Sequence, residues 1–206
     1  MFKKMLVALL LGCSLSGSAQ SSKKIQLPKP NLDNKMTLMQ ALKNRKTVRE
    51  FAATQLSQQE VSNLLWAANG INRPENNNRT APSAMNVQDI SVYVVKSDGT
   101  YLYDAAKNTL TQVTDKDIRA DVAGRQDFMK NAPLFLLLVS DTSKFKGNAE
   151  VLSAMDAGYV SQNIYLYCAA ASLNTVARAT MNVDAIKSAL GLKETQVPLL
   201  NHPVGK

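Results

Sequence analysis

The sequence predicts a single α+β or mixed α/β domain. Two strand-like stretches, at 90–95 and 134–139, alternate with stretches of helical periodicity that need a common core. Of the 206 residues, 45% are hydrophobic and 19% are charged, a balance that excludes disorder along most of the chain. A chain of this length buries a sizeable core without disulfides or a structural metal, so one domain, with or without a targeting segment, accounts for it.

The formal net charge of +8 is spread along the chain and not gathered in one block. Such a charge attracts nucleic acid, anionic surfaces or phosphate-bearing cofactors. No zinc-finger or RNA-binding signature accompanies the basic residues, so we expect no nucleic-acid partner.

Residues 1–19 have the organisation of a secretory signal peptide. A lysine pair precedes the apolar run 5–11, and small residues at 17–19 mark a cleavage site. We therefore expect an exported protein, periplasmic or secreted, and the apolar run is too short for a stable membrane span. In the alternative reading, residues 10–13 resemble a bacterial lipoprotein box, and Cys13 would carry a lipid anchor.

Cleavage after residue 19 leaves Cys168 as the one thiol of the product. It lies in an apolar, helix-like stretch, which predicts a buried structural thiol and not a nucleophile. With one Cys and one His, a Cys/His metal site lacks ligands, so no metal is expected. The one histidine, His202, is expected to lie in an exposed loop and not to act as a general acid.

The first half of the chain alternates between polar connections and helices. Residues 20–35 are polar and predict a tether, so the folded domain is expected to span 36–206. Helical spacing predicts a helix over 37–45 with Thr37 as N-cap. A capping box at 57–60 opens a second helix, which ends at the pair Asn69-Gly70.

The middle of the chain predicts the sheet. Residues 71–89, rich in Asn, Pro and Arg, predict a long loop without regular structure. Residues 90–95 alternate as a strand, and an Asp-Gly turn leads into 101–103, which predicts a hairpin. The apolar run 134–139 predicts a fully buried central strand.

The remaining elements are helical. Asp115, Asp117 and Asp121 are read as the acidic first turn of a helix and not as a carboxylate cluster. Residues 148–173 predict a long helix, apolar on most faces, such as lies at the centre of a bundle or a dimer. A last helix is expected over 182–191, from an Asn cap to a Gly.

Two segments are candidates for ligand binding. Residues 45–49 place three cations and a hydroxyl at the end of a helix, and arginine forks match phosphate oxygens. By composition alone a solvated helix end explains them equally well. Residues 82–88 offer short polar groups, with Ala84 allowing the backbone to approach a flat ligand.

Five motifs in a fixed order extend these observations. They are Arg-Lys-Thr-x-Arg at 45–49, Leu-Leu-Trp-Ala-Ala-x-Gly at 64–70, Ala-Pro-Ser-Ala-x-Asn-x-Gln at 81–88, Met-Asp-Ala-Gly at 155–158 and Ser-Gln-Asn at 161–163. Together they resemble the nitroreductase family over nearly the whole mature chain. The resemblance implies an α+β fold, with a mixed sheet flanked by helices, in which a homodimer shares two FMN sites.

The resemblance also implies a set of cofactor-binding residues. Arg45, Lys46, Thr47 and Arg49 would hold the ribityl phosphate and the pyrimidine side of the flavin. Pro82, Ser83, Ala84, Asn86 and Gln88 would line the isoalloxazine. Thr175, Val176, Ala177 and Arg178 would pass near the flavin edge. Gly205 and Lys206 match the Gly and basic residues that the family places near the phosphate.

The function that follows is an FMN-dependent oxidoreductase. Hydride would pass through flavin N5 to a nitroaromatic, quinone-like or other small acceptor, with NAD(P)H as electron donor. No catalytic acid or base is assigned, because the chemistry is borne by the flavin. The alternatives are a flavin-dependent oxidase or dehydrogenase, similar to peptide-azoline oxidases, and a non-catalytic exported flavin-binding protein.

Overall fold

The computed structural model describes residues 23–33 and 35–206. The predicted signal peptide, the lipoprotein box with Cys13 and the first residues of the predicted tether lie outside the described residues. Within the described part, no helix combines the length and the apolar character that crossing a membrane requires.

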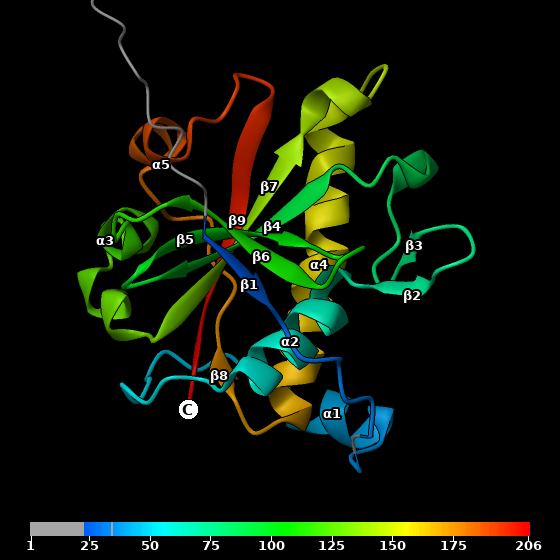
Figure 1. The fold of residues 1–206 in the computed structure, drawn as a ribbon, viewed down its shortest axis with the longest axis vertical. Helices are drawn as coiled ribbons and strands as arrows, with labels where there is room; N and C mark the ends of the chain where they lie inside the picture. The colour runs from blue at the N-terminus through cyan, green and yellow to red at the C-terminus, as the bar shows by residue number, and fades with distance from the viewer. Residues whose placement is uncertain (1–22, 34) are drawn as a thin grey trace, which may run out of the picture.

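A seven-stranded sheet forms the centre of the molecule (Figure 1). Its strands are β1 (Lys24–Gln26), β4 (Ile90–Lys96), β5 (Gly99–Asp104), β6 (Thr109–Thr114), β7 (Leu134–Asp141), β8 (Asn174–Thr175) and β9 (Gln196–Gly205). They lie in the order β1-β6-β5-β4-β7-β9-β8. The α+β class is confirmed, but the expectation of a mixed sheet is wrong, since each described pairing is antiparallel.

Helices cover both faces of this sheet (Figure 1). They are α1 (Leu38–Asn44), α2 (Gln58–Asn69), α3 (Arg119–Ala123), α4 (Ala149–Ala170) and α5 (Val183–Leu190), with short 3-10 turns η1 (Ala84–Asn86), η2 (Asp127–Asn131) and η3 (Thr142–Lys144). Helices α2 and α4 pack against one face, and α3 and α5 against the other. The long helix predicted from 148–173 is α4.

Side-chain caps fix where the helices begin. Thr37 and Ser57 each form a complete capping box, with Gln40 and Glu60 returning a bond to the cap backbone. Asn182 caps α5, which ends at Gly191 in the left-handed conformation that glycine adopts without strain. The three predicted helix starts are confirmed.

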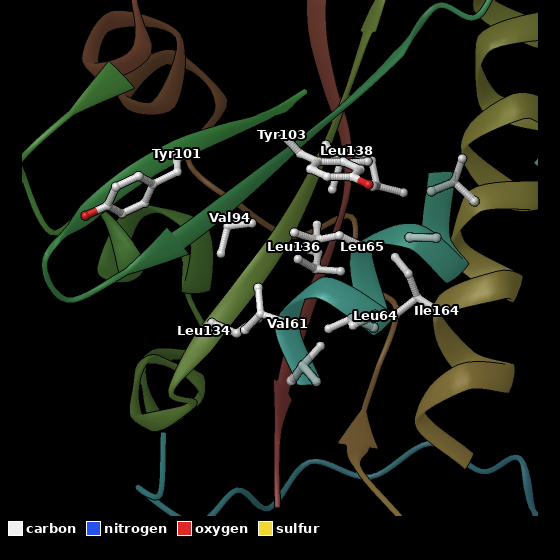
Figure 2. Packing of buried hydrophobic residues seen from close by; sticks show 14 of the residues in the cluster. Val61, Leu64, Leu65, Val94, Tyr101, Tyr103, Leu134, Leu136, Leu138 and Ile164 are labelled. Atoms are coloured by element: carbon white, nitrogen blue, oxygen red, sulfur yellow. The ribbon is translucent and has the colours of Figure 1, made fainter. Parts of the chain in front are cut away.

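Strand β7 is the centre of the core, as its apolar run predicts. Leu134, Leu136 and Leu138 point toward α2 and α4 (Figure 2). Phe135 and Leu137 point the other way, into the cluster formed with α3 and α5. Because successive side chains alternate between the faces, a strand covered on both faces is apolar throughout.

Four expectations need correction. The loop 71–89 contains a small hairpin of β2 (Ile71–Arg73) and β3 (Asn78–Arg79), followed by η1. The predicted tether contributes β1, which pairs with β6 at the sheet edge. Strands β6 and β9 were not expected. In the acidic segment only Asp121 lies in the first turn of α3, whereas Asp117 precedes the helix and pairs with Arg119 at 2.8 Å.

Candidate functional site

The side chain of Tyr165 on α4 organises the cationic segment 45–49. The guanidinium of Arg45 lies over its ring, 5.2 Å from the centroid, a distance at which cation–π attraction operates. Its hydroxyl lies 3.0 Å from Thr47 Oγ1 and accepts the backbone N–H of Ala177 at 2.9 Å. Tyr165 therefore fixes the end of α1 against the strand that follows α4.

Backbone hydrogen bonds join the same segment to the end of the chain. The N–H of Val48 donates to the carbonyl of Thr175 at 3.0 Å, and that of Ala52 donates to Lys206 at 2.6 Å. Strand β8 in turn pairs with the last residues of β9. The structure thus brings together three predicted stretches, 45–49, 175–177 and 205–206, near the chain end marked in Figure 1.

Gly205 lies where the backbone passes close to Pro133. A Cβ at this position would lie 2.8 Å from Pro133 Cδ and 3.4 Å from Phe51 Cβ. A larger residue would push the end of β9 away from the 45–52 segment, so glycine is required by packing here.

The cations of this region are available for a ligand. Within residues 23–33 and 35–206, Arg45, Lys46 and Arg49 form no ion pair, whereas Lys206 pairs with Glu60 at 3.1 Å. Arg45 is half-buried, and the other two are exposed. Unpaired guanidinium and ammonium groups beside a hydroxyl are the donor set that suits a phosphate ester.

A cavity of about 290 Å³ opens beside these groups. Its walls include Lys46, Val48, Tyr165 and residues 172–175. Ligand pockets usually measure about 300–1,000 Å³. The volume of this cavity lies close to the lower end of that range.

The loop 82–88 has a strained backbone. Met85, Asn86 and Gln88 have φ values of 52°, 53° and 49°, in the left-handed region that favours glycine. Each such residue costs on the order of 1 kcal/mol and persists only where its surroundings hold it. Strain of this kind is concentrated at binding and catalytic sites.

Hydrogen bonds hold this loop at both ends. The N–H of Ala84 donates to both carboxylate oxygens of Asp156, each at 3.0 Å. At the other end, the N–H of Gln88 donates to Ser83 Oγ at 2.9 Å. Lys144 Nζ donates to the Gln88 carbonyl at 2.8 Å, and Arg79 Nε donates to Gln88 Oε1 at 3.0 Å.

Within one chain the loop and the cationic segment lie apart. The loop is held by Asp156 and the cationic segment by Tyr165, nine residues further along α4. At about 1.5 Å and 100° per residue, these side chains project from opposite sides of the helix, about 13 Å apart along its axis. The two groups therefore lie on different sides of α4 within one chain.

Helix α4 also exposes an apolar row. Val151, Met155 and Tyr159, spaced four residues apart, are 61%, 50% and 43% exposed. Met85 of the loop is 70% exposed. Apolar side chains gathered in this way are typical of a surface that another protein covers.

Arg178 takes a different role from the one the sequence suggested. Its guanidinium is buried and donates four hydrogen bonds, to Gln126 Oε1, Asn201 Oδ1 and the carbonyls of Val122 and Ala123. Burial lowers the pKa of Arg178. The side chain is turned into the subunit, so the expectation that it reaches a flavin edge is corrected. Val176 is likewise part of the core.

His202 is buried in β9, so its predicted place in an exposed loop is wrong. Thr175 Oγ1 donates to the Pro203 carbonyl at 2.9 Å, so it accepts from His202 Nδ1 at 3.1 Å. His202 Nε2 then accepts the hydroxyl of Ser161 at 2.8 Å. Burial lowers the pKa of His202 to about 3, which keeps the ring neutral.

This histidine supports Tyr165 from behind. The two rings meet edge to face, with centroids 5.3 Å apart and an interplanar angle of 80°. No local sequence pattern signals this role, because its partners are distant in sequence. The prediction for Cys168 is confirmed: it is buried in α4, and burial raises the pKa of its thiol.

Comparison with known proteins adds three findings. A model of the nitroreductase family matches residues 42–206. A crystal structure from Ralstonia eutropha, described as a nitroreductase, is 35% identical, with 99% of this chain and 95% of that chain covered and a TM-score of 0.84. A Methanocaldococcus jannaschii protein, also named a nitroreductase, is 29% identical over 195 residues, which cover 88% of this chain and 96% of the relative.

One structure with a different named activity shares the fold alone. The Escherichia coli microcin synthetase complex contains a chain that is 16% identical, with a TM-score of 0.69. The match covers 97% of this chain and 84% of that chain.

Proposed function

This chain belongs to the nitroreductase family of oxidoreductases, and we propose that it acts as an FMN-dependent homodimer. It takes hydride from NAD(P)H and passes it to a nitroaromatic, quinone-like or other small acceptor. The observation that carries this proposal is the segment 45–49, whose cations form no ion pair with described residues, with Arg45 over the Tyr165 ring and Lys46 in the cavity wall. The family generally binds FMN and uses NAD(P)H, which agrees with that donor set.

The residues present fit the phosphate end of FMN. Arg45 and Arg49 offer charge-assisted bonds to a phosphate, which are about twice as strong as neutral ones. Lys46 and Thr47 add single donors, and Lys206 reaches the same region from β9. When bound, FMN supplies a ring that accepts and releases hydride at N5.

The loop 82–88 fits the flat part of the cofactor. In the proposed homodimer, the partner subunit supplies this loop to the flavin that the cations of the first chain hold. The backbone of the loop is held by hydrogen bonds to Asp156 and Lys144, and Pro82, Met85 and Asn86 are exposed. The exposed row of Val151, Met155 and Tyr159 on α4 offers the apolar surface for pairing two chains. Pairing through α4 would bring the loop of one chain toward the cations of the other.

The protein's contribution to the reaction is binding, orientation and charge. A fixed cation near the pyrimidine side stabilises the negative charge of a reduced flavin. The described residues hold His202 neutral and bury Cys168, so neither acts as a proton donor at the site. One flavin face must stay open so that donor and acceptor can occupy it in turn.

Export is a separate proposal that rests on the signal-like pattern of residues 1–19. Mass spectrometry of protein from its native host would give a mature N-terminus near Gln20. An intact Met1 would refute export, and a lipid on Cys13 would replace the cleavage site.

The decisive test of the flavin is the visible absorbance spectrum of the purified full chain after incubation with FMN and removal of free cofactor. We expect flavin bands that NADH bleaches without oxygen and that a nitroaromatic or a quinone restores. Protein that retains no FMN would refute the cofactor. Retained FMN that neither NADH nor NADPH reduces would refute the proposed donor.

A further inference from the structure

Two buried carboxyl groups, those of Asp89 and Asp156, line one small cavity together with residues of the loop 82–88. Asp156 on α4 accepts the N–H of Ala84 with both oxygens, and Asp89 directly follows the loop. Each residue is 1% exposed. Asp89 Oδ2 accepts the hydroxyl of Ser140 at 2.5 Å, whereas Asp89 Oδ1 has no hydrogen-bond partner among the described residues.

Neither carboxyl group is neutralised by a cation in the described structure. The charged groups on the neighbouring elements are engaged elsewhere. Arg79 of β3 and Lys144 of η3 donate to Gln88, and Asp141 of β7 accepts from Ser143. Two ionised carboxylates in such a place would repel each other and lack solvation.

Protonation of one carboxyl group resolves this conflict. Burial and the neighbouring carboxyl group of Asp156 raise the pKa of Asp89 to about 6, against the opposing effect of the hydrogen bond from Ser140. A proton on Asp89 lets the acid donate to Asp156, whose carboxylate oxygens accept the N–H of Ala84. The unpartnered oxygen of Asp89 is then accounted for.

We propose that Asp89 and Asp156 share one proton, and that this pair positions the loop 82–88 for flavin binding. The positioning part rests on the proposed function, whereas the shared proton does not. Both are positioning residues, since Asp156 acts through the Ala84 amide and Asp89 acts through Asp156. The pair opposes the strain of the left-handed residues in the loop.

The pair makes the loop sensitive to pH in a defined direction. The folded-state pKa of Asp89 lies above the ordinary value of about 4, so the folded protein holds this proton more tightly. The resulting stabilisation is complete below pH 4 and is lost as the pH rises through about 6. Loss of the proton leaves two negative charges close together. Their repulsion loosens the hydrogen bond that the Ala84 N–H donates to Asp156.

The first experiment needs no flavin. Carbon NMR of aspartate carboxyl groups and hydrogen exchange at the Ala84 amide are measured on the full chain and on Asp89→Asn, Asp156→Asn and Asp127→Asn. The Asp89→Asn side chain imitates the protonated acid. Asp127→Asn, at an exposed ion pair with Lys130, is the matched control.

We expect one carboxyl group of the wild type and the control to titrate near pH 6, and none to do so in Asp89→Asn. Exchange at Ala84, corrected for its intrinsic pH dependence, should quicken about tenfold from pH 5 to 8 in the wild type and stay constant in Asp89→Asn. Asp156→Asn keeps one acceptor oxygen for the Ala84 amide and carries no charge, so its exchange should not change with pH. Titration of both carboxyl groups below pH 5, or exchange in Asp156→Asn that still quickens with pH, would overturn the pair.

The second experiment links the pair to the cofactor. The Kd for FMN is measured at pH 5.5 and 8 for the wild type, Asp89→Asn and Asp127→Asn. A phosphate monoester itself titrates near pH 6, and this contribution is common to the three proteins. We expect the wild type and Asp127→Asn to bind FMN about tenfold more weakly at pH 8 than at pH 5.5. Asp89→Asn should not show this weakening.

Outcomes separate the two proposals. If the three proteins bind FMN with the same pH profile, the positioning role is refuted and the flavin assignment stands. If none of them binds FMN, the proposed function and the positioning role both fall, and the NMR titration alone decides whether the proton is shared.

Discussion

The segment 45–49 and the loop 82–88 are built in opposite ways, although both are candidates for the same cofactor. The cations of the segment form no ion pairs with described residues, and the segment is held by Tyr165, whose ring lies under Arg45 and whose hydroxyl contacts Thr47. The loop has strained backbone angles and hydrogen bonds at both ends, with anchors such as Asp156. The first region offers open charge, and the second offers a fixed shape.

The difference corresponds to what each end of a flavin nucleotide requires. A phosphate is recognised by charge and by free donors, which tolerate some movement. A flat ring system is recognised by a surface that does not move, because fixed groups lose little entropy on binding. The two regions belong to opposite sides of α4, which agrees with the proposed homodimer.

The largest expected effect comes from separating the two chains. Tyr159→Asp places a charge in the exposed apolar row of α4 and should give a monomer. Because the monomer keeps the cations and loses the partner's loop, FMN binding should weaken by about 100-fold or more. Light scattering and FMN titration measure the two properties, with Val113→Asp, on the exposed side of β6, as control. A monomeric variant with unchanged affinity would show that one chain holds the whole site.

Removing a cation should have the next largest effect. A charge-assisted hydrogen bond contributes about 1.5–3 kcal/mol, so Arg45→Ala and Arg49→Ala should each weaken FMN binding by roughly tenfold to a hundredfold. Lys107→Ala, at an exposed pair with Asp104, is the control. Arg49→Ala should leave the Tm unchanged, since Arg49 is exposed and has no ion-pair partner within 23–33 and 35–206. Equal affinity in the three variants would mean a solvated helix end and no phosphate anchor.

A third prediction concerns the neutral ring behind the cationic segment. The folded-state pKa of His202 is about 3, below its ordinary value of 6.5, so its neutral form stabilises the fold above pH 6.5. That stability is lost as the pH falls from 6.5 toward 3, because the unfolded chain then binds the proton first. At pH 5 the loss should be about 2 kcal/mol relative to pH 7.

Denaturant unfolding at pH 7 and 5 tests the role of His202. His202→Gln keeps polar atoms for Ser161 and Thr175 but does not titrate, so the difference between wild type and variant should shrink at pH 5. A difference that stays constant between the two pH values would mean that His202 is protonated in the fold.

The smallest effect is expected from Tyr165→Phe. The change keeps the ring under Arg45 and removes the hydroxyl that holds Thr47 and Ala177. Each hydrogen bond contributes about 1 kcal/mol net, so stability should fall by about 1–2 kcal/mol and FMN affinity by less than tenfold. Tyr159→Phe, on the exposed face of the same helix, is the matched control. A loss of FMN binding as large as that of Arg49→Ala would place the hydroxyl in contact with the ligand.

Elements with strong local signals were predictable from the sequence. Capping residues mark the starts of α1, α2 and α5, and an unbroken apolar run marks β7. Strand β9 has no such signal, since it contains two prolines and the polar pair Asn201-His202. Its neighbours β7 and β8 make it a strand, and a register shift beside Leu138 accommodates the irregular pairing.

The candidate site shows the same division. The types of residue and their order indicated that the stretches 45–49, 82–88 and 205–206 bind a cofactor. They did not indicate which side chains turn toward the inside of the subunit. Arg178 was assigned to the cofactor as part of the stretch that the family resemblance places near the flavin edge, whereas its guanidinium donates to buried carbonyls. The pairing of Asp89 with Asp156 joins residues far apart in sequence, so no local pattern reveals it.

Strand β9 has a consequence for how the protein is made. Its partner β7 ends at Asp141, about 55 residues before β9 begins at Gln196. At about 5–20 residues per second, a ribosome needs roughly 3 to 11 seconds to synthesise that interval. During this time the most apolar strand of the sheet has one unpaired edge, the kind of surface from which nascent chains aggregate. Added holding chaperones should therefore raise the yield of soluble protein more than a stabilising ligand does.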